Sequence, residues 1–305
     1  MKLSVCTITF RHHLLCFSEI VGWAQRNGFD GVELWGAHAR GLMRTHPEYG
    51  ADWIRSCGLS VPMLSDYLPT DGDVADIRHR TIQLCRIAQH WSARKIRTFA
   101  GNRPSAALSR DERRALARRI GEIAGIVQDH GIRLLVETHP NTLADNVEST
   151  LWLLADADHP SLGINFDALH VWEAGDDPVL ARRTLAEFIG HYHLKNVRSR
   201  AELGVFAPEN VYSAAGVRDG MVPLFDGAMD YDSFLSALAG ETDAEASLEW
   251  FGHDCFETLA RDRLAILARS ISTRGRRGSA AMQQARRAVS RAAGHVASSK
   301  GPSCI

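Results

Sequence analysis

The sequence of 305 residues lacks several features that would assign a protein class at once. Its six cysteines show no Cys-x-x-Cys spacing, which favours reduced thiols in a cytosolic protein. No apolar run approaches the roughly 20 residues that cross a bilayer. No glycine-rich phosphate turn follows an early strand, as it usually does in doubly wound sheets. A net charge of −1 gives no sign of nucleic acid or an anionic membrane as a partner.

The charge is nevertheless uneven along the chain. Residues 274–305 contain seven Lys and Arg but no Asp or Glu, so residues 1–273 carry 28 basic against 36 acidic side chains. We predict one domain over residues 1–272, followed by a basic tail, 273–305, that is disordered or forms a short helix. Residues 1–5 begin a strand and show no charged segment before an apolar one, so we expect a cytoplasmic protein.

Apolar periodicity predicts eight strands that alternate with about eight helices. The strands are expected at 3–9, 31–35, 59–67, 95–100, 133–137, 162–167, 191–196 and 246–250. The helices are expected at 17–27, 47–57, 73–91, 109–130, 146–155, 178–188, 231–239 and 256–270. Eight such repeats predict a (β/α)₈ TIM barrel, with a doubly wound sheet as the alternative. Ser109 and Glu112 fit a capping box, and we expect the long loop at 198–227 to cover the site.

The stretch from Leu134 to Asn141 opens as a buried strand and ends in polar groups. Side chains alternate faces along a strand, so Glu137 and His139 point the same way. Pro140 then ends the hydrogen-bonding ladder, because it has no N–H to donate. A carboxylate and an imidazole at the end of a barrel strand indicate a site that holds a metal ion and moves a proton.

Three later strand ends supply similar groups. The strand at 162–167 ends in Asp167, His193 lies on the next strand, and Glu249 ends the last. Together with Glu137 they form a mostly oxygen ligand set that suits Mn²⁺ or Mg²⁺, and Co²⁺ or Zn²⁺ less selectively. Without a cation, three converging carboxylates would repel one another. Neighbouring His191 is expected to be a structural histidine.

Motifs at the strand ends carry a family resemblance over most of residues 1–270. They are CTITFRH (6–12), GVELWG (31–36), SDYL (65–68), KIRTFAG (95–101), ETHPNTL (137–143), DHPSL (158–162), HYHLKN (191–196), GMVPLFDG (220–227) and SLEWFGH (247–253). The sequence resembles the xylose-isomerase-like, or endonuclease-IV-like, barrels. Within them it is similar to the 3-dehydroshikimate dehydratases of petrobactin biosynthesis. The resemblance implies one divalent metal, Mn²⁺ foremost, on the four residues above.

The reaction so implied is dehydration of 3-dehydroshikimate to protocatechuate through an enolate. The resemblance places His139 as the general base, and we expect its pKa to be unperturbed. Lys195 would stabilise the oxyanion, and His170 would serve as a second acid. Arg97 is expected to bind the substrate carboxylate, with a salt bridge inside the barrel as the alternative. The substrate would further contact four aromatic residues, for which plain packing is the alternative: Tyr67, Trp172, Phe206 and Phe251.

Three other functions compete with this one. A sugar isomerase or epimerase would use the same barrel and metal but return the proton. An apyrimidinic-site endonuclease would need a three-metal cluster with more histidines and a basic groove, whereas residues 1–273 are acidic. A binding barrel without activity would have no need for a base beside a ligand set. We therefore expect a small-molecule substrate and no nucleic acid or membrane partner; a homodimer is compatible with the sequence, and the product's use in siderophore supply or catabolism stays open.

Overall fold

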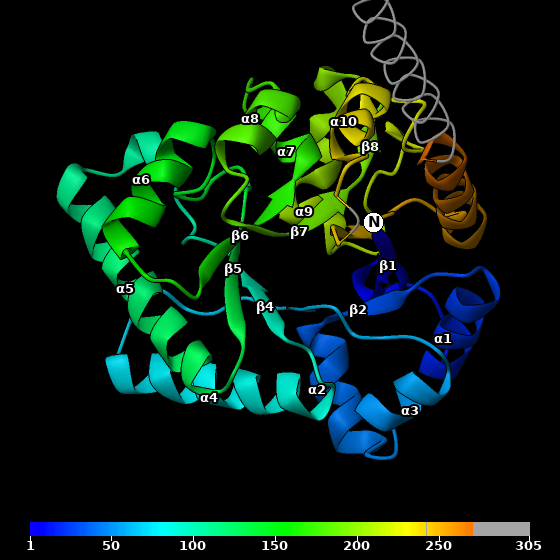
Figure 1. The fold of residues 1–305 in the computed structure, drawn as a ribbon, viewed down its shortest axis with the longest axis horizontal. Coiled ribbons are helices and arrows are strands. Elements are labelled where there is room, and N and C mark those ends of the chain that lie inside the picture. The colour runs from blue at the N-terminus through cyan, green and yellow to red at the C-terminus, as the bar shows by residue number, and fades with distance from the viewer. Residues whose placement is uncertain (242, 271–305) are drawn as a thin grey trace, which may run out of the picture.

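A computed structural model describes residues 1–241 and 243–270. Within them, eight parallel strands close into a barrel in the order β1-β10-β7-β6-β5-β4-β3-β2. Helices form an outer ring around these strands (Figure 1). The predicted (β/α)₈ barrel is thereby confirmed. The predicted basic tail, 273–305, lies outside the described residues.

The barrel strands largely follow the predicted pattern. They are β1 Lys2–Cys6, β2 Gly31–Trp35, β3 Leu64–Ser65, β4 Lys95–Thr98, β5 Arg133–Glu137, β6 Leu162–Asp167, β7 Ile189–Leu194 and β10 Glu245–Leu248. The predictions for β2, β5 and β6 are confirmed at both ends. The prediction of a long third strand over 59–67 is wrong, because Pro62 lacks an N–H and interrupts the ladder between the bridge at Ser60 and β3. The first strand also ends early, since residues Thr7–Phe10 form a 3₁₀ turn.

The helices of the outer ring are α1 Phe17–Arg26, α2 Gly36–Thr45, α3 Ala51–Ser56, α4 Val74–His90, α5 Arg110–Asp129, α6 Val147–Ala157, α7 Ala168–Glu173, α8 Pro178–Thr184, α10 Tyr231–Leu238 and residues 255–270. The helix predicted from residue 47 begins only at Ala51. Helix α2 was not predicted, because it contains two glycines and buries only Gly36 and Ala39, which leaves little apolar periodicity to detect. Helix α7 is too short for a periodic pattern.

Helix α5 shows how local chemistry places an element. The Ser109 hydroxyl accepts a hydrogen bond from the Glu112 backbone N–H at 3.3 Å, and the Ser109 N–H donates to the Glu112 carboxylate at 2.7 Å. This reciprocal pair satisfies two N–H groups that a helix start otherwise leaves open. The predicted capping box is confirmed.

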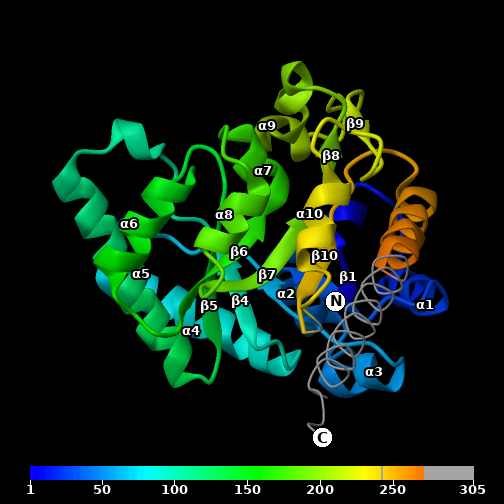
Figure 2. The same ribbon diagram turned by 45° about the horizontal axis from the view of Figure 1, so that its top comes forward.

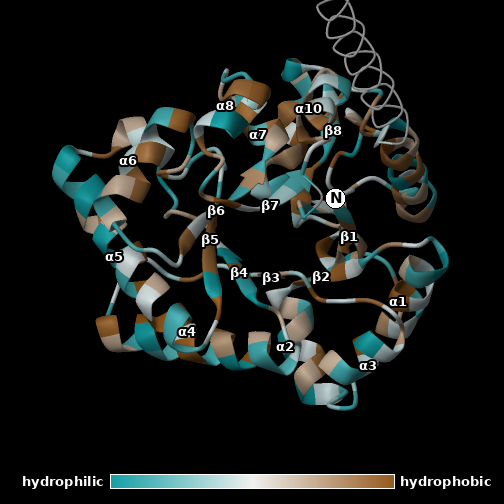
Figure 3. Ribbon diagram, viewed as in Figure 1, coloured by the Kyte–Doolittle hydropathy of each residue, from teal (hydrophilic) through white to brown (hydrophobic). Residues whose placement is uncertain are grey.

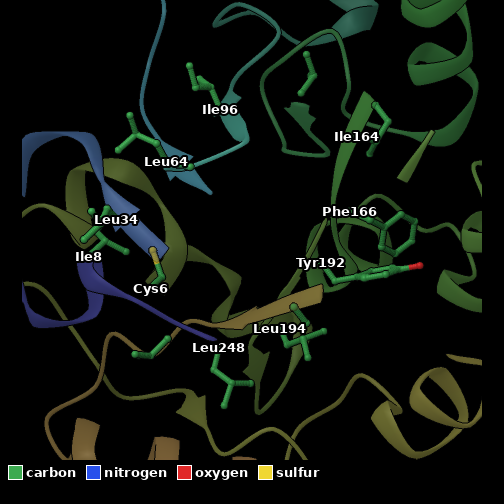
Figure 4. Packing of buried hydrophobic residues seen from close by; sticks show 14 of the residues in the cluster. Cys6, Ile8, Leu34, Leu64, Ile96, Ile164, Phe166, Tyr192, Leu194 and Leu248 are labelled. Carbon is green, nitrogen blue, oxygen red and sulfur yellow. The ribbon is translucent and has the colours of Figure 1, made fainter. Parts of the chain in front are cut away.

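Alternation along the strands divides the barrel into an apolar outer layer and a polar interior. Leu34, Ile96, Phe166 and Leu248 are at most 1% exposed and lie around the outside of the ring of strands (Figure 4). Their immediate neighbours on the same strands face inward. Helices such as α4 and α5 carry a mixture of apolar and polar residues, as expected for helices that cover a barrel (Figure 3). The interior is therefore left for polar side chains.

The segment 198–227, which we call the lid, was predicted to be a structureless loop, and this is wrong. It contains a 3₁₀ helix, Arg200–Phe206, and the short helix α9, Pro208–Val211. Its base is tied by two short antiparallel strands, β8 Asn196–Val197 and β9 Met221–Val222. Figure 2 shows α9, β8 and β9 grouped together at one end of the barrel.

Two further expectations concern the described residues only. The cysteines at positions 6, 16, 57, 85 and 255 are all free thiols, as predicted, while Cys304 lies outside the described part. Among residues 1–241 and 243–270, we find no helix with both the length and the apolar character needed to cross a bilayer.

We predict that Leu34→Ala lowers the free energy of unfolding by about 2–5 kcal/mol, since Leu34 is 0% exposed and its loss leaves a cavity between β2 and the helices. The matched control is Leu180→Ala on α8, where the side chain is 62% exposed and the change should be small. Urea unfolding of both variants measures the difference. Equal effects would contradict the assignment of the core.

Candidate metal centre and active site

The four predicted ligands converge inside the barrel at the carboxyl ends of their strands. Glu137, Asp167, His193 and Glu249 are each at most 7% exposed. The Nδ1 atom of His193 lies 3.5 Å from Glu137 Oε2 and 3.5 Å from Glu249 Oε1. Ligand atoms of Glu137, Asp167 and His193 all lie within 4.8 Å of one another. The barrel thus collects three carboxylates and one imidazole in one place.

Two observations show that this donor set fits a divalent cation. The His193 Nδ1 atom is buried and makes no hydrogen bond within the described part of the chain, although it faces two carboxylates. A buried nitrogen without a partner is costly unless something binds it. The second observation is that two of the carboxylates, Asp167 and Glu249, already bind a cationic group, the ammonium of Lys195.

Lys195 places its ammonium between two of the four ligands. Its Nζ donates to Asp167 Oδ2 at 2.5 Å and to Glu249 Oε2 at 2.8 Å. Burial opposes its charge, but Asp167 and Glu249 raise the pKa of Lys195 well above its ordinary value. An ammonium has three N–H donors, so one remains for another oxygen. The predicted role of Lys195 beside a substrate oxyanion is compatible with this position.

Arg97 pairs with the ligand Glu137. Its Nε lies 2.9 Å from Glu137 Oε2, and both side chains are 3% exposed. Burial opposes ionisation of Glu137, but Arg97 and His193 hold the pKa of this carboxyl well below its ordinary value. The Arg97 Nη1 atom is buried without a hydrogen-bond partner in the described residues. The salt bridge inside the barrel therefore exists, and a donor of the same guanidinium stays available.

His139 lies beside the ligand set with one ring nitrogen already engaged. Its Nδ1 donates to the Pro140 carbonyl at 2.7 Å, which leaves the Nε2 lone pair as the basic position. Its ring packs between Phe99 and His170, with centroid distances of 4.4 and 4.5 Å. Burial, together with the charge of His170, lowers the pKa of His139 to about 3. The expectation of an unperturbed pKa is therefore wrong, whereas the expected neutral imidazole is what this environment favours.

His170 follows Asp167 on helix α7 and is held by two carboxylates. Its Nδ1 lies 2.7 Å from Glu173 Oε2, and its Nε2 lies 3.8 Å from Asp167 Oδ2. Asp167 itself caps α7 by accepting the backbone N–H groups of Leu169 and His170. The cap explains why a ligand at the end of β6 also fixes His170 within reach of His139.

A pocket opens onto these groups and is closed on one side by the lid. Lid residues Phe206 and Tyr212 line it opposite the barrel, so the expectation that this segment covers the site is confirmed. The Tyr212 hydroxyl hydrogen-bonds the Tyr67 hydroxyl across the pocket mouth. The lining consists of Ile8, Tyr67, Arg97, Phe99, Glu137, His139, His170, Lys195, Phe206, Pro208, Val211, Tyr212, Glu249 and Phe251.

The structure does not bring every predicted site residue into this pocket. Tyr67, Phe206 and Phe251 line it, and the Lys195 ammonium lies 5.7 Å from the Phe206 ring centroid. Trp172 lies apart, with its ring against the Arg200 guanidinium at 3.8 Å. The reason is helical geometry: a residue two positions after His170 points to the other side of α7.

Sequence reasoning missed three residues around the site. Glu33 is fully buried beside His193; it is a carboxylate on a barrel strand, as three of the ligands are, but it stands in the middle of β2 rather than at its end. The Nε of Arg11 donates to the Val211 carbonyl at 2.8 Å. This hydrogen bond connects the turn that follows β1 to the lid. For Arg11 and for Tyr212 no sequence signal existed, because their partners are far away along the chain.

Comparison with known proteins places this geometry in a family. A family model described as the xylose isomerase-like TIM barrel matches residues 21–273. The chain belongs to this family. The TIM-barrel fold named in the family's description agrees with the closed eight-stranded barrel described above.

Individual relatives are more specific. The chain is 44% identical over 278 residues to the 3-dehydroshikimate dehydratase of Bacillus anthracis, covering 89% of this chain and 98% of the relative. A solved structure of the probable 3-DHS dehydratase involved in petrobactin synthesis from Bacillus anthracis superposes with a TM-score of 0.82 at 45% identity, covering 86% of this chain and 97% of that one. The resemblance drawn from the sequence motifs is confirmed. An L-ribulose 3-epimerase, with a TM-score of 0.70 at 16% identity over 92% of this chain and 98% of its own, shares the fold alone.

We predict that Arg97→Met destabilises the metal-free protein by about 3–5 kcal/mol near neutral pH, because it leaves the Glu137 charge buried without its partner. Glu137 has a lowered folded pKa, so its contribution is present above its ordinary value of 4.5 and is lost as the pH falls through the folded pKa. The deficit of the variant should therefore shrink in acid, where Glu137 takes up a proton.

The matched control is Arg103→Met. It breaks the same kind of arginine–carboxylate contact, with Glu112, but at the surface, where both side chains are about half exposed. Urea unfolding at neutral and acid pH compares the two variants. A deficit of Arg97→Met no larger than that of the control would show that the buried pair does not hold the Glu137 charge.

Proposed function

We propose that this protein is a divalent-metal-dependent dehydratase that converts 3-dehydroshikimate to protocatechuate. The observation that carries the proposal is a neutral imidazole, His139, in a pocket that two of the four proposed ligands, Glu137 and Glu249, also line. The 44% identity to the Bacillus anthracis dehydratase over nearly its whole length supports the choice of substrate. The relative's place in petrobactin synthesis makes siderophore supply the first use of the product to consider.

Glu137, Asp167, His193 and Glu249 would hold the cation. Three oxygen ligands favour Mn²⁺ or Mg²⁺, with Co²⁺ also compatible. When bound, a divalent cation supplies Lewis-acid polarisation of the substrate's ketone oxygen. The remaining steps belong to side chains of this chain.

His139 takes the proton from the carbon next to the ketone. Its Nε2 lone pair is the free end of a ring whose Nδ1 is held by Pro140, so the ring cannot turn away from the pocket without losing that bond. The low pKa of His139, caused by burial and by His170, makes the protonated ring a strong acid. That acid can return the proton to the β-hydroxyl as it leaves, so one residue serves both halves of the elimination.

Two cations complete the substrate site. The third N–H of Lys195 is available to the negative charge that develops on the former ketone oxygen. The Nη1 atom of Arg97 offers a buried donor to the substrate carboxylate. Tyr67, Phe206 and Phe251 supply flat walls for a six-membered ring that becomes aromatic when the water has left.

The first test is metal removal. Protein stripped of metal should leave 3-dehydroshikimate unchanged, and addition of Mn²⁺ or Mg²⁺ should restore the growth of the catechol ultraviolet absorbance of protocatechuate. The control is the same substrate with metal and no protein. If no divalent ion produces protocatechuate, the proposed substrate is wrong. The same loaded protein is then assayed with keto-sugars, because an isomerase or epimerase on this barrel would need the same base and ligands.

The second test separates base from ligand. His139→Asn should lower kcat by about 10²–10⁴-fold while the protein still binds its metal, because His139 moves the proton and is not one of the four proposed ligands. Glu249→Gln is the companion variant and should lose metal and activity together. Turnover and metal content, measured on the same samples, check both. Near-normal turnover of His139→Asn would exclude His139 as the base, and full metal content of Glu249→Gln would exclude Glu249 as an important ligand.

A further inference from the structure

Glu33 lies directly behind the metal-binding histidine. It is fully buried on β2, and both of its carboxylate oxygens lie 3.1 Å from His193 Nε2. The opposite ring nitrogen of His193, Nδ1, faces Glu137 and Glu249 at 3.5 Å. The imidazole is therefore held between Glu33 on one side and the predicted metal ligands on the other.

The groups that face Glu33 are all hydrogen-bond donors. The Ser65 hydroxyl donates to Oε1, and the Cys6 thiol lies 3.5 Å from the same oxygen. Burial, followed by the charge of Glu33, raises the pKa of Cys6 well above its ordinary value, so this group stays a thiol. The third group is His191, whose Nε2 lies 3.5 Å from Glu33 Oε2.

The hydrogen on His191 can be located by its other contact. Its Nδ1 lies 3.4 Å from the Lys95 ammonium, which can donate but cannot accept. The neutral ring therefore carries its hydrogen on Nε2, the atom that faces Glu33 and also lies 2.8 Å from the Ser247 hydroxyl. Glu33 is thus a hydrogen-bond acceptor. Each of its partners described here can donate to it: Ser65, Cys6, His191 and His193.

This arrangement decides which nitrogen of His193 can bind a metal. The form of imidazole that binds a metal is the neutral one, which has one N–H and one lone pair. A carboxylate against Nε2 requires the hydrogen there, which leaves the lone pair on Nδ1, directed at the space between Glu137 and Glu249. Metal-binding histidines are commonly oriented in this way by a carboxylate on the far nitrogen.

We propose that Glu33 is a positioning residue that fixes the tautomer and orientation of His193 for metal binding. The proposal rests on the metal site of the proposed function but not on its substrate. None of the hydrogen-bond and ion-pair partners of Glu33 described above lines the pocket, and His193 is the one proposed metal ligand among them.

One other arrangement of the same groups must be distinguished. Glu33, His191 and His193 have ligand atoms within 4.8 Å of one another and could themselves hold a cation. Against this, the His191 Nε2 hydrogen and the Ser65 hydroxyl are directed to acceptors already present. The metal count of the loaded protein separates the two arrangements.

The test variant is Glu33→Gln, which keeps the shape of the side chain and replaces one acceptor oxygen by an NH₂ donor. A neutral amide binds the Nε2–H of His193 less strongly than a carboxylate does, and its NH₂ is satisfied only if a neighbour such as the Ser65 hydroxyl turns to accept it. We expect Mn²⁺ affinity, measured by isothermal titration, to fall by about 10–100-fold. The circular dichroism spectrum should stay that of the wild type. Binding as tight as in the wild type would overturn the proposal.

Ser247→Ala is the matched control. Ser247 is also fully buried in the barrel, and its hydroxyl hydrogen-bonds His191. It is paired with His193 through the backbone of the β7–β10 ladder, which the variant leaves unchanged. Its Mn²⁺ affinity should be that of the wild type. An equal loss in both variants would show that any disturbance of the barrel interior weakens the site, and this would also overturn the proposal.

A second measurement uses the wild-type protein and so does not depend on whether a variant folds. In ¹⁵N-labelled wild-type protein loaded with Zn²⁺ as a diamagnetic probe, the His193 ring should show a hydrogen-bonded Nε2–H and a metal-bound Nδ1. A ring bound through Nε2, or a second equivalent of metal on Glu33, would contradict the proposal. Neither readout involves 3-dehydroshikimate, so failure of the substrate assignment and failure of this inference are separate results.

Discussion

The interior of this barrel depends on a balance of buried charge. Four carboxylates, Glu33, Glu137, Asp167 and Glu249, lie within a region that water scarcely reaches. Each would be costly alone, because a buried charge without a partner pays its full desolvation penalty. Arg97, His193 and Lys195 supply the positive charge that makes the arrangement tolerable. The pKa directions of both kinds of group follow from this mutual support.

The same balance prepares the site for chemistry. Burial opposes ionisation of Glu137 and Asp167, but the positive groups that face them lower their pKa values, so these two carboxyls favour the ionised state that a metal ligand requires. The Nδ1 atom of His193 has no hydrogen-bond partner among the residues that the structure describes, and Lys195 occupies part of the space where positive charge is needed. His139 stands just outside this network, neutral, with burial and His170 both opposing its protonation. Ligands and base thus differ in charge because their surroundings differ.

The outer layer of the barrel explains how such a costly interior persists. Leucine, isoleucine and phenylalanine side chains between strands and helices supply the apolar burial that stabilises the fold (Figure 4). Polar groups appear on the inward positions of the same strands, because successive residues point to opposite faces. The lid lines one side of the pocket and is joined to the barrel by contacts such as the Tyr67–Tyr212 pair, which connects residues 145 positions apart.

The sequence by itself determined the barrel and much of its inner surface. Short apolar segments gave the bounds of β2, β5 and β6, and strand-end chemistry pointed to Glu137, Asp167, His193 and Glu249, which the structure brings together. It could not show the interrupted third strand, where Pro62 outweighed an apolar run, or the helices hidden in the lid. Only the tertiary structure decided that Arg97 pairs with Glu137, that His139 has a lowered pKa, and that Glu33 lies against His193. The reason is physical: alternation along a strand reports which face a side chain occupies, but partners and pKa values depend on groups from strands that are distant in sequence and meet only when the barrel closes.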